Sequence, residues 1–316
     1  MSLNNIAILG AGTMGHGIGQ IFAQHGLAVT VYDPHPAALQ AASEKVLRNL
    51  RLLQENQGGE AVNPGLTVSN LMFTSDLSAA ITGADLVIEA VPENLTIKWS
   101  LYSQIAPMLK PTAIVTSNTS TFALETLAFE QPFADRFLIT HFFNPAPLIP
   151  LVEIVQLDIT IPGIAGQLIE LLRACGKVPV LLKKDIAGFI ANRLQAAVMR
   201  EACYLLESGI AEAAQIDTAM KEGPGLRWAI GGPFEIADYG GLDVWEKVTG
   251  HLFPQLGASQ EAPELIREKV AKGELGVKTG AGFYTYGNPA QQERQSGERD
   301  RKLLGLLQVK AGNNKA

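Results

Sequence analysis

Residues 6–15 read IAILGAGTMG, a short apolar run that passes directly into three glycines spaced Gly-x-Gly-x-x-Gly. A buried strand, this loop and then an apolar helical stretch from Ile18 form the arrangement that binds a dinucleotide. Gly10 is expected to make the tight turn, Gly12 to admit the pyrophosphate, and Gly15 to let helix and strand pack closely. The start of the helix then receives the phosphates. The predicted phosphate-binding residues are Gly10, Gly12, Thr13, Met14 and Gly15.

The acidic residue expected beyond this loop is Asp33, which ends a second predicted strand at 28–32. It lies at about the 20-residue distance at which a carboxylate accepts hydrogen bonds from the adenosine ribose. A carboxylate repels a 2′-phosphate and no arginine follows directly, so NAD is favoured over NADP. The alternative is a structural turn followed by an exposed aspartate, because a lone glycine motif is weak evidence.

Strand and helix patterns divide the chain of 316 residues in two. Up to about residue 184, short Val/Ile/Leu runs alternate with amphipathic segments, as in a Rossmann-type, doubly wound and mostly parallel α/β sheet. Beyond it, long helical periodicity predicts an all-α domain. We therefore expect an NAD-binding domain at 1–184 and a helical substrate and dimerisation domain at 185–316. The expected strands are 5–9, 28–32, 86–89, 113–117, 137–141, 152–155 and 179–182.

Composition excludes several classes of protein. A net charge of −6 with no clustered Lys and Arg disfavours nucleic-acid binding. The apolar runs are too short to span a bilayer, the N-terminus has no export-signal pattern, and no Cys/His cluster has metal-ligand spacing. Cys175 and Cys203 make no disulfide framework, which fits a reducing cytoplasm. The sequence thus predicts a cytoplasmic protein that binds a small molecule and neither nucleic acid, membrane nor metal.

Further motifs resemble the 3-hydroxyacyl-CoA dehydrogenase family in order and spacing. They are ADLVIEAVPEN at 84–94, SNTS at 117–120, HFFNP at 141–145, GFIANR at 188–193 and KTGAGFY at 278–284. Together with the glycine loop they cover nearly the whole chain. The resemblance implies an NAD-dependent oxidoreductase that acts on a CH–OH group, works in fatty acid metabolism and forms a homodimer.

The same resemblance places the catalytic residues. His141 resembles the family's catalytic histidine and Glu153 its acidic partner. Alcohol oxidation independently needs a base near neutral pH, which imidazole provides. Ser120 and Asn192 match the residues that hold the substrate's reacting oxygen. The alternatives are a packed histidine, a plain salt-bridge glutamate, a solvent-facing asparagine, and Ser117 and Ser120 as caps of a helix at 121–127.

Three further residues match cofactor-binding positions of the family. Glu93 and Lys98 correspond to positions near the nicotinamide side of the cofactor, and Asn118 is an additional candidate.

Two stretches depart from the acyl-CoA members. Residues 47–57 offer Arg48 and Arg51 in place of the lysines that help to hold CoA. Residues 225–233, GLRWAIGGP, are similar to the gulonate and carnitine dehydrogenase, lambda-crystallin-like branch, whose substrates are small free hydroxy acids. Arg227 could there clamp a carboxylate bidentately. The alternative is a surface arginine stacked on its tryptophan neighbour.

Three functions follow as hypotheses. The first is an L-3-hydroxyacyl-CoA dehydrogenase for short-chain substrates such as 3-hydroxybutyryl-CoA. The second is a dehydrogenase of a free 3-hydroxy acid, with Arg227 as the carboxylate clamp. The third is a non-catalytic, crystallin-like NAD-binding protein. The complete set of His141, Glu153, Ser120 and Asn192 argues against the third.

Overall fold

The computed structural model describes residues 3–56 and 63–313 and divides into two compact units, with the division after Ile190. The sequence-based boundary after residue 184 lies a few residues earlier. Each unit is described by itself below.

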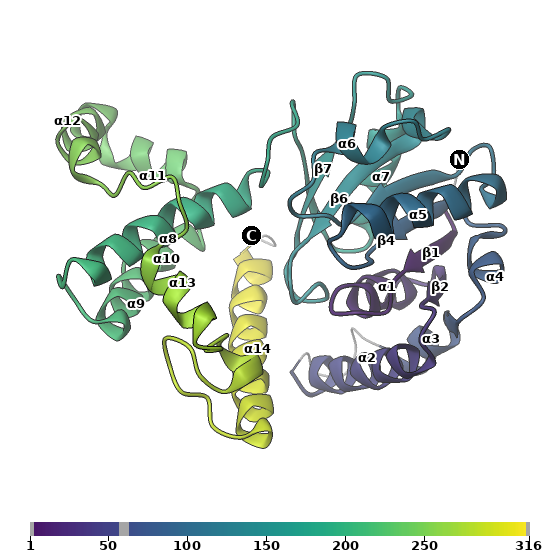
Figure 1. Ribbon diagram of the computed structural model, residues 1–316, viewed down its shortest axis with the longest axis horizontal. Coiled ribbons are helices and arrows are strands. Elements are labelled where there is room, and N and C mark those ends of the chain that lie inside the picture. The colour runs from purple at the N-terminus through teal and green to yellow at the C-terminus, as the bar shows by residue number, and fades with distance from the viewer. Residues whose placement is uncertain (1–2, 57–62, 314–316) are drawn as a thin grey trace. The chain divides into compact units, whose positions relative to one another are not determined.

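A β-sheet forms the centre of the first unit (Figure 1). It has eight strands in the order β3-β2-β1-β4-β5-β6-β7-β8. All neighbouring strands run parallel except β6 and β7, which are antiparallel. This confirms the predicted doubly wound, mostly parallel sheet. The strands are β1 (Asn5–Leu9), β2 (Ala28–Tyr32), β3 (Leu71–Thr74), β4 (Leu86–Glu89), β5 (Ile114–Ser117), β6 (Phe137–Phe142), β7 (Leu151–Val155) and β8 (Val178–Leu181).

The sequence predicted every strand except β3. That edge strand is short and only partly buried, so its LMFT run carries little of the buried-strand signal.

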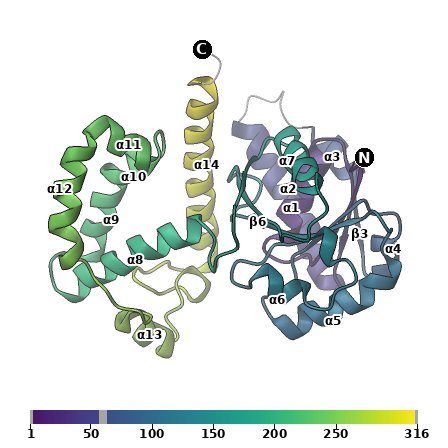
Figure 2. The same cartoon turned by 90° about the horizontal axis from the view of Figure 1, so that it is seen from above.

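Helices cover both faces of the sheet, as seen from above in Figure 2. Alternate strand residues point to opposite faces, which gives two separate apolar clusters. One cluster joins the sheet to α1, α2 and α7, and the other joins it to α4, α5 and α6. The helices of this unit are α1 (Gly15–Gln24), α2 (Pro36–Asn56), α3 (Pro64–Ser69), α4 (Leu77–Ile81), α5 (Leu95–Ile105), α6 (Leu124–Ala128) and α7 (Ile164–Ala174).

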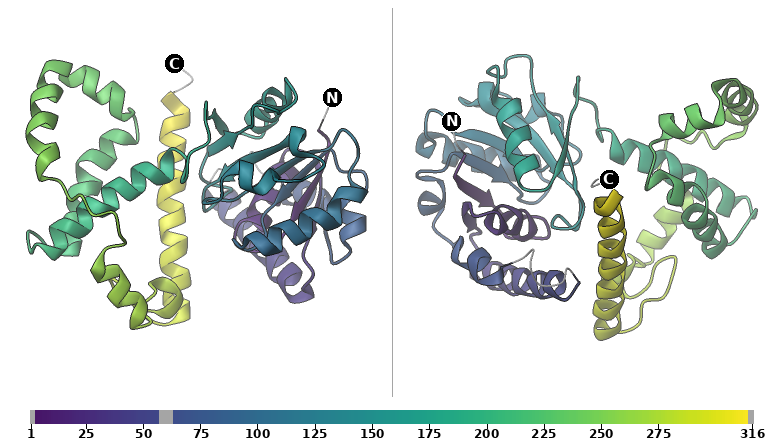
Figure 3. Two further views of the ribbon diagram at one scale, coloured as in Figure 1. Left: turned by 45° about the horizontal axis from the view of Figure 1, so that its top comes forward. Right: turned by 180° about the vertical axis from the view of Figure 1, so that it is seen from behind.

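The second unit is helical, as predicted, and ends in a long helix (yellow in Figure 3). Among its described side chains, at 191–310, only those of Cys203 and Leu304 are buried. In the described part of the chain, no helix is long and apolar enough to cross a membrane. The helices are α8 (Ala191–Glu207), α9 (Ala213–Glu222), α10 (Pro224–Trp228), α11 (Pro233–Gly240), α12 (Leu242–Leu252), α13 (Glu264–Ala271) and α14 (Pro289–Asn313).

Candidate active site

The glycine loop joins β1 to α1 with no room for side chains at two positions. Gly10 has a φ of +108°, and a Cβ there would lie 2.6 Å from the carbonyl oxygen of Ala90. A Cβ on Gly15 would lie 1.8 Å from the carbonyl oxygen of Gly10. Gly12 faces open space, since a Cβ there would meet no atom within 4 Å. The backbone at Gly12 is therefore accessible, and Thr13 and Met14 lead from it to the start of α1. An accessible backbone at the start of a helix fits a pyrophosphate.

Asp33 lies beside this loop at the end of β2. Its Oδ2 accepts a hydrogen bond of 3.0 Å from the Ala11 N–H, and its Oδ1 accepts one of 3.0 Å from the His35 N–H. The backbone thus fixes the carboxylate next to the phosphate-binding turn. That is the position from which it can accept hydrogen bonds from a ribose, so the residues fit NAD.

His141 and Glu153 form a buried pair across the antiparallel strands β6 and β7. They are direct partners in the strand register, so both side chains point to the same face of the sheet. His141 Nδ1 lies 2.9 Å from Glu153 Oε2. The imidazole packs beside the ring of Phe143, at a centroid distance of 4.5 Å. Within residues 3–56 and 63–313, Nε2 has no hydrogen-bond partner, so it can exchange a proton with a substrate.

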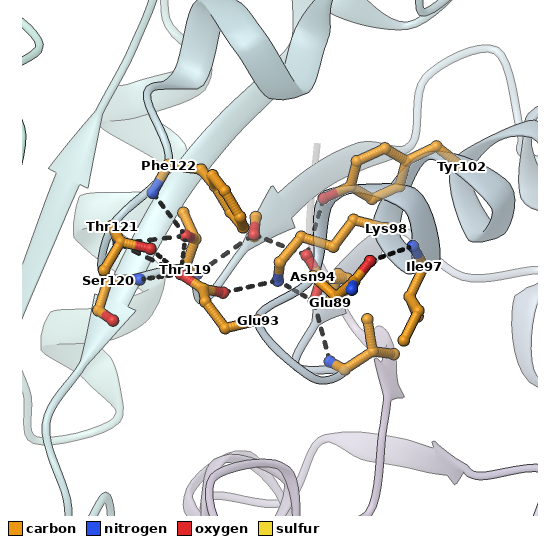
Figure 4. Close-up of polar contacts among 12 residues, drawn as sticks. Glu89, Glu93, Asn94, Ile97, Lys98, Tyr102, Thr119, Ser120, Thr121 and Phe122 are labelled. Atoms are coloured by element: carbon orange, nitrogen blue, oxygen red, sulfur yellow. Dashed lines mark hydrogen bonds and ion pairs between the residues drawn. The ribbon is translucent and has the colours of Figure 1, made fainter.

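A second buried network begins at Glu89, the last residue of β4 (Figure 4). Its Oε1 lies 2.7 Å from Lys98 Nζ on α5, while Oε2 accepts hydrogen bonds of 2.7 Å from both Tyr102 and Ser117. Lys98 is 1% exposed and also lies 3.2 Å from Glu93 Oε2. One ammonium therefore links two carboxylates, and a buried charge is tolerated only with such partners.

Glu93 connects this network to the loop after β5, which contains Ser120. Its Oε1 accepts hydrogen bonds from the Thr119 hydroxyl, from the Thr121 hydroxyl at 2.7 Å and from the Ser120 N–H at 3.1 Å. Burial acts to raise the pKa of Glu93, but the Thr119 and Thr121 hydrogen bonds and the charge of Lys98 hold it below its usual value. Glu93 is therefore ionised, and its carboxylate fixes the backbone of Ser120.

Asn118 connects two strand ends. Its side-chain Oδ1 accepts a hydrogen bond of 2.9 Å from the Phe142 N–H, next to His141. Its own N–H donates to the Glu89 carbonyl at 2.8 Å. Asn118 therefore holds the end of β6 against the end of β5, and its side-chain nitrogen makes no hydrogen bond within the described part of the chain.

The helix expected at 121–127 begins later, at Leu124, and no side chain of its N-cap residue caps it. The Leu124 N–H donates instead to Asp185 Oδ2 at 2.7 Å. Ser117 donates to Glu89, and the Ser120 hydroxyl has no hydrogen bond within the described part of the chain. Ser117 Oγ also accepts a hydrogen bond of 3.2 Å from the Thr119 N–H, so Ser117 does form the expected Ser/Thr turn. Neither serine caps the helix, because the helix starts after them and Asp185, a residue distant in sequence, caps it.

The structure brings most of the candidate residues to one edge of the sheet. Gly10, Glu93, Ser120 and His141 all lie at or just beyond the carboxyl ends of parallel strands, where open α/β sheets bind ligands. Asn192 lies in the second unit, where it is the second residue of α8. Arg227, also in that unit, is exposed on α10 and makes no ion pair among the described residues.

Sequence reasoning missed Glu89, Thr119, Thr121 and Phe189. Glu89 had a detectable signal, since it is a carboxylate at a buried position of an otherwise apolar strand. Thr119 and Thr121 had none, because only the folded loop brings them to Glu93. Among the described residues, no group of His, Cys, Asp and Glu is arranged to hold a metal ion.

Both units match domains of one known protein family. The 3-hydroxyacyl-CoA dehydrogenase NAD binding domain matches residues 5–186, and the C-terminal domain of the same family matches residues 188–286.

Two relatives are named for different kinds of substrate. The 5-formyl-3-hydroxy-2-methylpyridine 4-carboxylate 5-dehydrogenase of Mesorhizobium japonicum is 34% identical over 98% of this chain and 99% of its own. The human mitochondrial hydroxyacyl-coenzyme A dehydrogenase is 34% identical over 90% of this chain and 91% of its own.

Solved structures show the same two kinds of relative, one named for a pyridine carboxylic acid and one for a CoA ester. A crystal structure of the pyridine carboxylate dehydrogenase, described as an NAD+ dependent dismutase, has a TM-score of 0.90, 33% identity and 98% coverage of both chains. The (S)-3-hydroxybutyryl-CoA dehydrogenase PaaH1 from Ralstonia eutropha has a TM-score of 0.74 and 33% identity, with 91% of this chain and 100% of that chain covered.

Proposed function

This chain belongs to the 3-hydroxyacyl-CoA dehydrogenase family of NAD-dependent oxidoreductases, and from that premise we propose that His141 is the base that removes the hydroxyl proton of its substrate. The observation that carries this proposal is the buried contact of 2.9 Å between His141 Nδ1 and Glu153 Oε2. It leaves Nε2 as the ring atom that exchanges a proton.

The geometry supports a reversible reaction. In oxidation, Nε2 of His141 takes the hydroxyl proton, and Glu153 stabilises the imidazolium that forms. NAD, when bound at the glycine loop, supplies the acceptor for the hydride. In reduction, the imidazolium returns the proton to the oxygen. We assign Ser120 and Asn192 to the substrate oxygen, with Glu93, Lys98 and Asn118 shaping the nicotinamide side.

Removing the base tests this assignment. His141→Ala should lower kcat by at least about a hundredfold, the usual scale for a positioned acid–base group. NAD binding, followed by fluorescence quenching, should persist because Asp33 and the glycine loop are unchanged. A preparation of His141→Ala with wild-type turnover would show that another group is the base. NAD binding without any turnover in the wild type would instead favour the crystallin-like hypothesis.

For the substrate, we propose a small hydroxy acid with a free carboxylate. The support is the near-complete match, at a TM-score of 0.90, to an enzyme named for a pyridine carboxylate. The exposed Arg227 guanidinium and the sparse basic residues at 47–57 agree with it. The second candidate, a short-chain L-3-hydroxyacyl-CoA in fatty acid metabolism, is favoured by the hydroxybutyryl-CoA and human relatives, which match nine-tenths of the chain.

Steady-state kinetics separate these candidates. We expect free L-3-hydroxybutyrate, L-gulonate or L-carnitine to be turned over with a higher kcat/KM than 3-hydroxybutyryl-CoA. Arg227→Ala should raise KM for the free acid, while Lys221→Ala, a change on the neighbouring helix, should not. Efficient turnover of the CoA ester with a silent Arg227→Ala would establish the second candidate.

We further propose that the protein is a homodimer built through its second unit. The helices of that unit leave large apolar side chains exposed, such as Tyr239, at 94%, and Phe234, at 85%. A second copy of the chain would remove this surface from water. A cytoplasmic location stays a prediction, and the human relative is named as mitochondrial.

A further inference from the structure

Phe189 has an unusual backbone conformation near the catalytic pair. Its φ is +48°, in the left-handed region that bulky residues avoid, and Gly188 before it has a φ of +77°. The Phe189 ring is buried and lies 5.3 Å from the His141 ring, centroid to centroid. A backbone outlier of this kind calls for a functional explanation.

The turn at 188–190 fixes the orientation of Glu153. The Ile190 N–H donates a hydrogen bond of 2.8 Å to Glu153 Oε1, while Oε2 contacts His141 Nδ1 at 2.9 Å. Both oxygens of the carboxylate are thus occupied, so rotating it would break one contact or the other. Phe143 and Phe189 pack beside the imidazole, and Glu153 contacts its Nδ1.

We propose that Phe189 is a positioning residue for the His141–Glu153 pair. Its buried ring holds residues 188–190 in the left-handed turn, and the turn presents the Ile190 N–H to Glu153. The carboxylate in turn keeps the imidazole oriented and stabilises its protonated form. This inference rests on the proposed role of His141 as the base.

Two substitutions distinguish the effect of losing the Phe189 ring from the effect of losing the backbone turn. Phe189→Ala removes the ring but keeps a Cβ, which still disfavours a positive φ, so the turn should relax and release Glu153. Phe189→Gly also removes the ring, but glycine adopts a positive φ without strain. The Ile190 hydrogen bond should therefore persist in the glycine variant.

The measurements are kcat and KM for oxidation. In Phe189→Ala we expect kcat to fall by roughly tenfold or more, a smaller loss than the roughly hundredfold expected for removing the base itself. KM should stay near its wild-type value, because the change leaves the proposed substrate-binding residues in place. Phe189→Gly should lose less kcat than Phe189→Ala. Glu130 offers a matched control, since its φ is +55° at an exposed turn, and Glu130→Ala and Glu130→Gly should both behave as wild type.

Two results would overturn the proposal: a Phe189→Ala enzyme with wild-type kcat, or equal losses of kcat in both variants. NADH binding and thermal unfolding verify that each variant is folded. A second comparison keeps this inference separate from the proposed function. An active His141→Ala enzyme would overturn the function itself, whereas an inactive His141→Ala enzyme beside a wild-type-like Phe189→Ala enzyme would overturn only the inference.

Discussion

The two units bury their apolar side chains to very different extents. In the first unit the sheet residues form two clusters under helices on both faces, and even charged groups such as Glu89 and Lys98 are buried with partners. In the second unit, the described side chains at 191–310 include only two that are buried. The first unit therefore completes its own core, whereas the second leaves most of its large apolar side chains exposed. Three predictions test this difference.

The largest effect is expected from breaking the buried network of the first unit. Lys98→Met would leave Glu89 with its charge buried and no cation beside it, which costs about 3–5 kcal/mol of unfolding free energy. Equilibrium urea unfolding measures this loss. Lys110→Met is the matched control, because its ion pair with Asp85 is partly exposed and such pairs contribute about 0–1 kcal/mol.

The double variant Glu89→Gln with Lys98→Met should be more stable than Lys98→Met alone, since it removes the unpaired charge. A single Lys98→Met variant within about 1 kcal/mol of wild type would contradict the importance of this network.

A smaller effect is expected from changing the surface of the second unit. Phe234→Lys would place a charge in the proposed dimer interface and cost about 2 kcal/mol or more of association free energy. Sedimentation velocity should then show a shift from dimer to monomer at low protein concentration. Phe129→Lys is the control, because Phe129 is 62% exposed but belongs to the first unit. Equal dissociation of both variants, or no dissociation of either variant, would argue against an interface on α11.

The smallest effect concerns Lys177, which is buried in the first unit beside β8. Its Nζ donates to the carbonyls of Ala146 and Ile149 at 2.6 and 2.9 Å, in the loop between the strands of His141 and Glu153. Burial lowers the pKa of Lys177 to about 8, from 10.5. Above pH 8 the unfolded chain therefore binds more protons at this residue than the folded chain does, and stability rises with pH.

Between pH 8 and 9 this gain should be about 1 kcal/mol. Above pH 9 Cys175 acts in the opposite direction, because burial raises its pKa to about 11, from 9.0. Unfolding measured at pH 7, 8 and 9 should show the rise in the wild type and in Lys184→Met, an exposed lysine of the same unit. Lys177→Met should lack it, and a Lys177→Met variant with the same rise would assign the effect to another group.

Parts of the fold were predictable because their signals are local. The apolar run at 6–9 and the glycines after it encode a strand and a tight turn over neighbouring residues, and the other buried strands show the same Val/Ile/Leu composition. Edge strand β3 was missed because none of its residues is fully buried. His141, Glu153 and Ser120 were predicted from family motifs, which carry no information about the contact between His141 and Glu153.

By itself, then, the sequence determined a Rossmann-type unit with a glycine loop and Asp33 suited to NAD, followed by a helical unit. Only the tertiary structure decided that His141 and Glu153 are cross-strand partners, that Lys98 links Glu89 to Glu93, and that the Ile190 N–H donates to Glu153. These contacts depend on strand register and on packing between segments far apart in the chain. Composition and periodicity report only on neighbours in sequence, so they do not encode such contacts.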